Sequence, residues 1–225
     1  MPEALPENFR DWNEQMVLRY DPEIFHHHPR SMVRWVEGKR VRAVLKSVAA
    51  RPEHRILDVG CGAGNILAQL PGNRTGVDIS DFMVKRATEL LRGQAQIINA
   101  DAEELPFGAS EFDRVVASSM LSHVLHPEKV ISELRRVVKP DGRVVISIAH
   151  EDQIEKGLRW ARALGLGGEQ SGDVKNQPYH VDYHLHRFSI KRLRGLTEKS
   201  FVEVALRKVP TFLFPAHYIV TLKPR

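Results

Sequence analysis

The sequence contains very little cysteine and no long apolar run. Its 225 residues include a single cysteine, Cys61, which excludes a disulfide within the chain. Proteins without disulfides are typical of reducing compartments, so a cytoplasmic location is expected. No apolar run approaches the ~18 residues of a membrane-spanning helix, and no membrane span is predicted. Cys61 lies between two glycines, where we interpret it as a small residue that fills a turn.

The overall composition is that of an ordinary globular protein, with 42% hydrophobic and 27% charged residues. The length suits one domain with a full core and a small cap. A formal net charge of +5 permits an anionic partner, but the basic residues are spread along the chain except at residues 191–194. That cluster falls on an expected helix, where we interpret it as a solvated face. No segment has the features of a separate RNA-binding domain, and no nucleic-acid partner is expected.

Strand and helix patterns alternate through the middle of the chain. Strands are expected at residues 56–59, 75–78, 96–99, 113–118 and 143–148. Helices are expected between them at residues 65–70, 81–91 and 127–138. This alternation predicts an α/β fold with a parallel sheet and right-handed crossovers. Later in the chain we expect a helix over 151–164, a flexible loop over 165–179, a helix over 189–199, and strands over 201–209 and 216–222.

The first fifty residues lie outside this alternation and predict a helical cap. Trp12, Met16 and Tyr20 are spaced four residues apart, so they share one face of an expected helix. A second helix is expected over residues 31–50. Three adjacent histidines at residues 26–28 diverge in direction and predict no metal site. We therefore divide the chain into a cap at 1–50 and a main domain at 51–225, with a lid insertion at about 151–188.

The most informative stretch is Asp58-Val59-Gly60-Cys61-Gly62-Ala63-Gly64, at the end of the first expected strand. Glycine lacks a Cβ, so its backbone can take positive φ and lie directly against a ligand. Amides at the start of a following helix can then meet a polar or anionic group. Dinucleotide sites use glycines spaced as G-x-G-x-x-G, whereas Asn65 occupies the place of the last glycine here. This departure disfavours an NAD enzyme.

The glycine stretch resembles the first motif of class I S-adenosylmethionine (SAM) dependent methyltransferases. Further segments look like this family in the family's order, at residues 76–80, 96–102, 104–107, 112–119 and 134–147. The resemblance covers roughly residues 55–148 and is to the small-molecule, UbiE-like branch. It implies a Rossmann-like, seven-stranded, mostly parallel sheet in the order 3-2-1-4-5-7-6, with helices on both faces. It also implies SAM as the cofactor and S-adenosylhomocysteine as the product.

The resemblance implies roles for residues at the carboxyl ends of the first strands, the edge where open α/β sheets bind ligands. The loop of Gly60, Gly62 and Gly64 would hold the methionine part of SAM. Asp58 would orient that loop or meet the amino group. Ser118, at the end of the fourth strand, would border the methyl group.

Four further positions and one backbone amide would recognise the adenosine part of SAM, again by resemblance. Asp78 would accept hydrogen bonds from the ribose hydroxyls, and Ile79 and Met83 would lie against the adenine. Asp101 would accept a hydrogen bond from the adenine amino group, helped by the amide of Ala102.

The methyl acceptor is expected to be a small molecule with an oxygen, nitrogen or carbon nucleophile. Nucleic-acid amino-methyltransferases carry Asn/Asp-Pro-Pro-Tyr after the fourth strand, whereas this chain has residues 117–120 as Ala-Ser-Ser-Met. An RNA-modifying methyltransferase and an inactive SAM-binding regulator are the alternatives. A hydroxyl acceptor needs a base, and histidine suits neutral pH. His123, His184 and His186 are the candidates, of which His123 has the best position.

Aromatic residues outside the expected sheet could contact the acceptor. The candidates are Trp12, Tyr20, Phe25 and Tyr183. Together with the glycine-rich loop at 165–179, the N-terminal aromatic residues would form a lid that excludes water from the reaction. The chain is expected to be a monomer or a homodimer.

Overall fold

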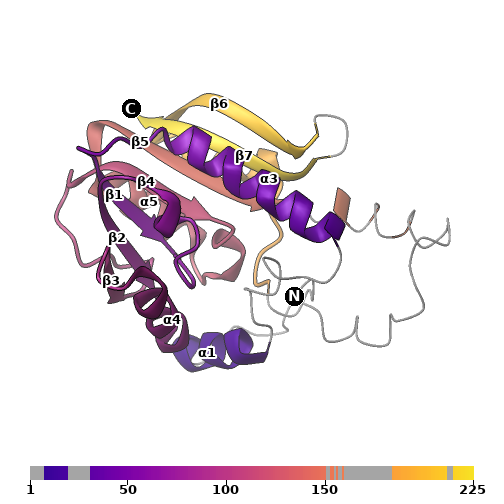
Figure 1. The fold of residues 1–225 in the computed structure, drawn as a ribbon. Helices are drawn as coiled ribbons and strands as arrows, with labels where there is room; N and C mark the ends of the chain where they lie inside the picture. Colours follow the sequence, from indigo (N-terminus) through magenta and orange to yellow (C-terminus); the bar gives the residue numbers. More distant parts are fainter. Residues whose placement is uncertain are drawn as a thin grey trace.

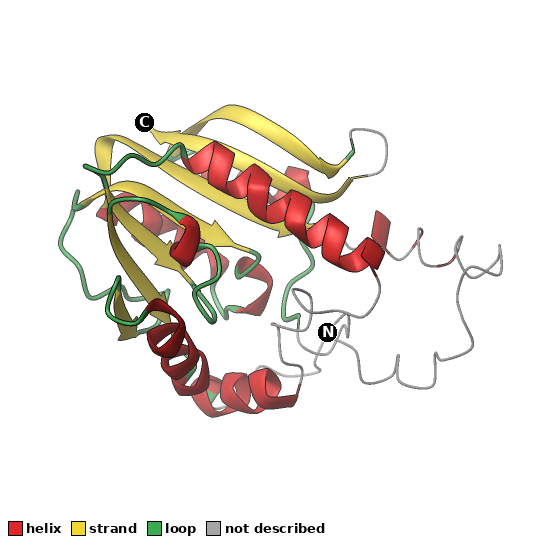
Figure 2. Cartoon of the chain, viewed as in Figure 1, coloured by secondary structure: helices red, strands yellow, loops and turns green. Residues whose placement is uncertain are grey.

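The computed structural model describes residues 8–19, 31–150, 153, 154, 156, 159, 184–211 and 215–225. Within these ranges the chain forms one twisted sheet with helices packed on it (Figures 1 and 2). The expected lid loop, Tyr20, Phe25 and Tyr183 lie outside the described residues. The division into a cap and a main domain stays a prediction.

The sheet has seven strands in the order β3-β2-β1-β4-β5-β7-β6, which confirms the order implied by the resemblance. The strands are β1 (Arg55–Val59), β2 (Asn73–Asp78), β3 (Gln96–Asn99), β4 (Phe112–Ser118), β5 (Val138–Ala149), β6 (Phe201–Pro210) and β7 (Pro215–Pro224). Strands β1 to β5 are parallel, and β7 pairs antiparallel with both β5 and β6. The carboxyl ends of the parallel strands therefore meet at one edge.

The described helices are α1 (Phe9–Arg19), α3 (Ser31–Val48), α4 (Asp81–Leu91), α5 (Pro127–Val137) and α7 (Ile190–Thr197), with 3-10 turns η1 (Leu67–Gln69) and η2 (Leu121–His123). Helix α4 begins where its sequence predicts, because Ser80 Oγ accepts a hydrogen bond from the Met83 amide at 3.1 Å. Pro127 opens α5, where its missing N–H is not needed.

Two apolar layers hold the helices on opposite faces of the sheet. Helices α5 and α7 pack on one face, in the larger core cluster. Helices α3 and α4 pack on the other face, against residues such as Ile56, Val116 and Val145. Val115, Val116 and Ala117 in the middle of β4 are fully buried, as expected for a parallel strand covered on both sides.

Two expected elements were wrong in extent. The helix expected over residues 65–70 is only the short turn η1, because Pro71 follows at once and forces Leu70 into an extended conformation (φ −91°, ψ 140°). Strand β5 begins at Val138 rather than at Arg143, since Val138 pairs with Phe112 before a register shift. Neither difference changes a residue whose side chain forms the hydrogen bonds of the candidate site.

Candidate functional site

The glycine loop after β1 has the left-handed backbone that its sequence predicts. Gly60, Gly62 and Gly64 have φ values of 67°, 53° and 84°. A Cβ at Gly60 would lie 2.7 Å from Met120 Cβ, and one at Gly64 would lie 3.0 Å from Leu91 Cδ1. A Cβ at Gly62 would meet nothing within 4 Å. Packing therefore requires the outer glycines, while Gly62 borders open space on the ligand side of the loop.

Asp78 ties this loop to the end of β2. Its Oδ2 accepts a hydrogen bond from the Gly62 amide at 2.9 Å, and its Oδ1 accepts one from the Ser80 amide at 3.0 Å. Burial raises the pKa of Asp78, and the hydrogen bonds from these two amides oppose that rise. The carboxylate expected to meet a ribose thus also fixes the glycine loop and the start of α4.

Asp58 lies beneath the loop and is almost completely buried, with 1% of its surface exposed. Its Oδ1 has no hydrogen-bond partner. Burial raises the pKa of Asp58 to about 7, with a further contribution from the charge of Asp78. An unpartnered buried carboxyl oxygen is costly, so this atom is suited to a donor such as an ammonium group. The glycine cradle and this orphaned oxygen together fit the amino-acid part of SAM.

The remaining residues expected at the adenosine part of SAM lie after the ends of β2 and β3 and in α4. Ile79 is half-buried, and Asp101 Oδ1 accepts a hydrogen bond from the Glu103 amide at 2.8 Å. Ala102 is buried in the larger core cluster. Met83 is 1% exposed and packs with Ala63 and with α1, so its side chain supports the loop from beneath helix α1.

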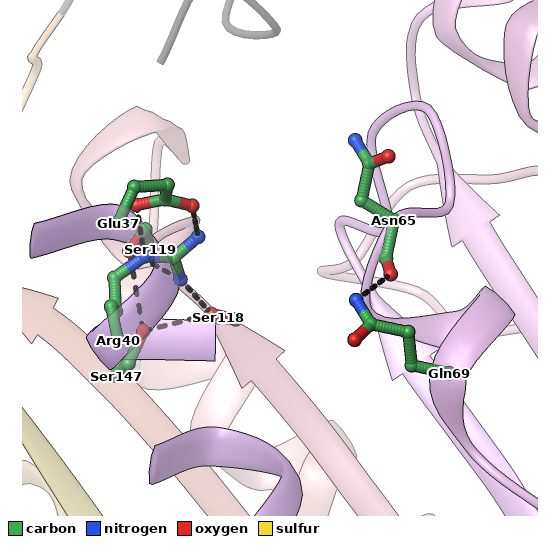
Figure 3. Close-up of polar contacts among 7 residues, drawn as sticks. All are labelled: Glu37, Arg40, Asn65, Gln69, Ser118, Ser119 and Ser147. Atoms are coloured by element: carbon green, nitrogen blue, oxygen red, sulfur yellow. Dashed lines mark hydrogen bonds and ion pairs between the residues drawn. The ribbon is translucent and has the colours of Figure 1, made fainter. Parts of the chain in front are cut away.

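A polar network that sequence reasoning missed lies at the end of β4 (Figure 3). Arg40 of α3 donates from Nη1 to Ser118 Oγ at 2.5 Å and to Ser119 Oγ at 3.4 Å. Glu37, one turn earlier, accepts from Arg40 Nε at 2.8 Å and from Nη2 at 2.5 Å. Ser147 Oγ lies 2.9 Å from Ser118 Oγ, which extends the network to β5. In the sequence, Glu37 and Arg40 look like an ordinary surface pair on a helix.

His217 of β7 is a second residue that the sequence did not indicate. Its Nδ1 is buried and has no hydrogen-bond partner. Burial and, to a smaller extent, the positive charge of Arg40 lower the pKa of His217 to about 3. The imidazole is therefore neutral at physiological pH, beside the charged pair of Glu37 and Arg40.

The histidines expected as bases differ in their surroundings. His123, in η2 after β4, and His184 form a T-shaped ring pair with centroids 4.7 Å apart. His186 Nε2 lies 3.0 Å from the Leu125 carbonyl oxygen, and its Nδ1 lies 3.2 Å from Arg192 Nη2. Both ring nitrogens of His186 are thus engaged by the protein. The structure therefore brings His123 and His184 together, whereas the His186 ring contacts Leu125 and Arg192.

A small pocket lies at the ends of β4 and β5. Its lining combines hydroxyls with apolar side chains, from Ser119, Leu121, Ser122, Ser147, Ile148, Ala149 and Phe188. Trp12 lies instead on α1, which packs on α4 at the opposite end of the site. Within the described ranges, no group of three potential metal ligands is found. None of the helices described there is long and apolar enough to cross a membrane.

Comparison with known proteins identifies the part of the chain that carries this site. Residues 57–146 match the family described as methyltransferase domain. Over these residues the chain is similar to a methyltransferase domain. The matched residues run from β1 into β5, so they include the glycine loop, Asp78, Asp101 and Ser118.

Curated relatives resemble about half of this chain, over part of their own length. A demethylmenaquinone methyltransferase of Clavibacter sepedonicus is 38% identical over 109 residues, covering 46% of this chain and 44% of the relative. The O-methyltransferase cnsE of Penicillium expansum is 38% identical over 107 residues, covering 44% of this chain and 38% of the relative. The matches thus span less than half the length of these relatives.

Solved structures share the fold of this chain. A SAM-dependent methyltransferase of Thermotoga maritima superposes with a TM-score of 0.67, covering 97% of this chain and 100% of that one. The two sequences are 19% identical, so the likeness shows the fold.

The substitution His217→Asn should make the stability of the chain less sensitive to acid. The pKa of His217 rises from about 3 in the folded chain to the ordinary 6.5 on unfolding. The unfolded state therefore binds more protons, and stability falls by ~1.4 kcal/mol per pH unit as pH drops from 6.5 toward 3. When the pH is lowered from 6.5 to 5, the free energy of unfolding measured in urea should fall by ~1–2 kcal/mol more for the native chain than for the variant. Equal losses would contradict this assignment.

Proposed function

We propose that this chain transfers the methyl group of SAM to a small-molecule acceptor. One observation carries the proposal: the glycine loop is fixed by Asp78 beside the point where the strand order reverses, between β1 and β4. Open α/β sheets bind ligands at such a switch point. The methyltransferase family match of the same residues supports the same ligand class.

The proposed cofactor site follows the polar atoms at this edge. Asp58 Oδ1, which has no partner, takes the amino group of SAM, and the Gly60 to Gly64 turn receives the methionine part. Asp78 meets the ribose while it holds the loop, and Asp101 with the Ala102 amide meets the adenine amino group. When bound, SAM supplies a methyl group on a positively charged sulfur.

Methyl transfer from a sulfonium is an in-line displacement that depends mainly on orientation, which can contribute ~7–11 kcal/mol. The network of Glu37, Arg40 and Ser118 fixes the end of β4, where the methyl group would lie. An unpaired arginine would repel a sulfonium, but the bidentate pairing with Glu37 neutralises Arg40. The serine hydroxyls are thereby oriented with little added positive charge.

On the acceptor side, hydroxyl and apolar side chains lie together at the ends of β4 and β5, and this mixture supports a partly apolar acceptor. His123 and His184 adjoin η2 at the end of β4, where they can remove a proton from a hydroxyl acceptor. The acceptor contacts of Trp12, Tyr20, Phe25 and Tyr183 stay predictions. A cytoplasmic location stays part of the proposal, supported by a sequence whose single cysteine excludes a disulfide within the chain.

S-adenosylhomocysteine should raise the melting temperature of the chain, and NAD should not. A ligand at 100 times its Kd adds ~2.7 kcal/mol to the native state. For a chain of this size, that corresponds to a shift of ~5–10 °C. Thermal unfolding with each ligand and with none gives the comparison. A shift with NAD and none with S-adenosylhomocysteine would falsify the cofactor assignment.

The substitution His123→Gln should slow methyl transfer to a hydroxyl acceptor by ~10²–10⁴-fold, because the proton acceptor is removed. Its affinity for S-adenosylhomocysteine should not change, since His123 lies on the acceptor side. Transfer of labelled methyl from SAM to a panel of phenols measures the rate. His186→Gln is the matched control, because that ring is engaged by Leu125 and Arg192. Native turnover in His123→Gln would rule out this base.

A further inference from the structure

Helix α1 covers the cofactor half of the site. Val17 of α1, Ala63 of the glycine loop and Met83 of α4 form one buried apolar cluster. Arg10 Nη1 donates a hydrogen bond to Asn99 Oδ1 at the end of β3. Helix α1 is therefore fixed to the loop, to α4 and to β3, which surround the place proposed for the adenosine.

At the end of β2, two backbone amides already use part of the acceptor capacity of the Asp78 carboxylate. Each of its carboxylate oxygens already accepts one backbone amide, from Gly62 and from Ser80. Asn99 Nδ2 donates to the carbonyl oxygens of Asp78 and Ile79, at 3.3 Å and 3.0 Å. Asp78 is thus held in one orientation by the loop it supports. A vicinal diol brings two donors, and a second carboxylate beside Asp78 offers a separate acceptor for one of them.

Glu14 of α1 provides a second carboxylate at this place. Its Oε1 accepts a hydrogen bond from the Phe82 amide, in the first turn of α4, at 3.0 Å. Its Oε2 is buried and has no hydrogen-bond partner. The charge of Glu14 also contributes to the raised pKa of Asp78, which follows from the closeness of the two groups. Capping α4 uses one oxygen of Glu14, and the other is left for a donor that the chain does not supply.

We propose that Glu14 accepts a hydrogen bond from one ribose hydroxyl of the cofactor, while Asp78 accepts one from the other. This inference rests on the proposed function, because it assigns a residue to the SAM site. It makes α1 part of the cofactor site rather than a cover for the acceptor. Since Glu14 Oε2 is buried, α1 must lift from α4 as the ribose enters and pack on it afterwards.

Calorimetric titration with S-adenosylhomocysteine and with its 2′-deoxy and 3′-deoxy analogues tests the assignment. Glu14→Gln keeps an oxygen for the Phe82 amide, so the cap of α4 is preserved. The variant should bind S-adenosylhomocysteine ~10-fold or more weakly than the native chain, the range expected for a charged hydrogen bond. For the analogue that lacks the hydroxyl bound by Glu14, the variant and the native chain should bind alike. Asp11→Asn, an exposed carboxylate on the same helix, is the control and should bind all three ligands as the native chain does.

Three results would overturn the inference, and they are distinguishable. If the native chain binds S-adenosylhomocysteine and Glu14→Gln binds it equally well, Glu14 is only a cap of α4. An equal loss for all three ligands would also exclude contact with a particular hydroxyl. If the native chain binds none of the ligands, the proposed function fails together with the inference.

Discussion

The hydrogen bond from the Gly62 amide to Asp78 is the interaction on which the site depends. It joins the loop after β1 to the end of β2. The Ser80 amide, just before α4, donates a hydrogen bond to the other oxygen of the same carboxylate. Backbone hydrogen bonds from the Cys61 amide to the Val77 carbonyl and from the Gly64 amide to the Cys61 carbonyl hold the rest of the glycine loop. With the loop held in this way, the open side of Gly62 and the unpartnered oxygen of Asp58 face a defined place. The chain therefore builds the cofactor half of its site from backbone amides and buried carboxyl groups.

The end of β4, where the methyl group of SAM would lie, is built differently, from side chains on the sheet face that α3 covers. Ser118 pairs in register with Ser147, and His217 pairs with Ala149 on the next strand. Arg40 and Glu37 of α3 lie on this polar row, above an otherwise apolar layer. Burial of these charges is tolerated because Glu37 and Arg40 pair bidentately and His217 is neutral. These side chains therefore carry little net charge at the place proposed for the sulfonium of SAM.

Much of the fold followed from the sequence because its signals are local. Alternating strands and helices, the Ser80 cap and Pro127 are readable from neighbouring residues, and the family resemblance supplied the strand order. Long-range partners had no such signal: Arg40 meets Ser118 only because α3 lies across the sheet, 78 positions away. The sequence likewise did not indicate that α1 would cover Met83, since an amphipathic helix can pack on several surfaces.

Titration of S-adenosylhomocysteine into the Asp78→Asn variant tests the central claim most directly. The native carboxylate accepts hydrogen bonds from the amides of both Gly62 and Ser80. Asparagine has one accepting oxygen, so its NH2 group would face one of these two amides, and that hydrogen bond would be lost. Asp81→Asn, an exposed substitution at the start of α4, is the matched control. The account predicts a folded Asp78→Asn variant with affinity lowered ~10-fold or more, from the loss of charged hydrogen bonds. Native affinity in that variant would contradict it.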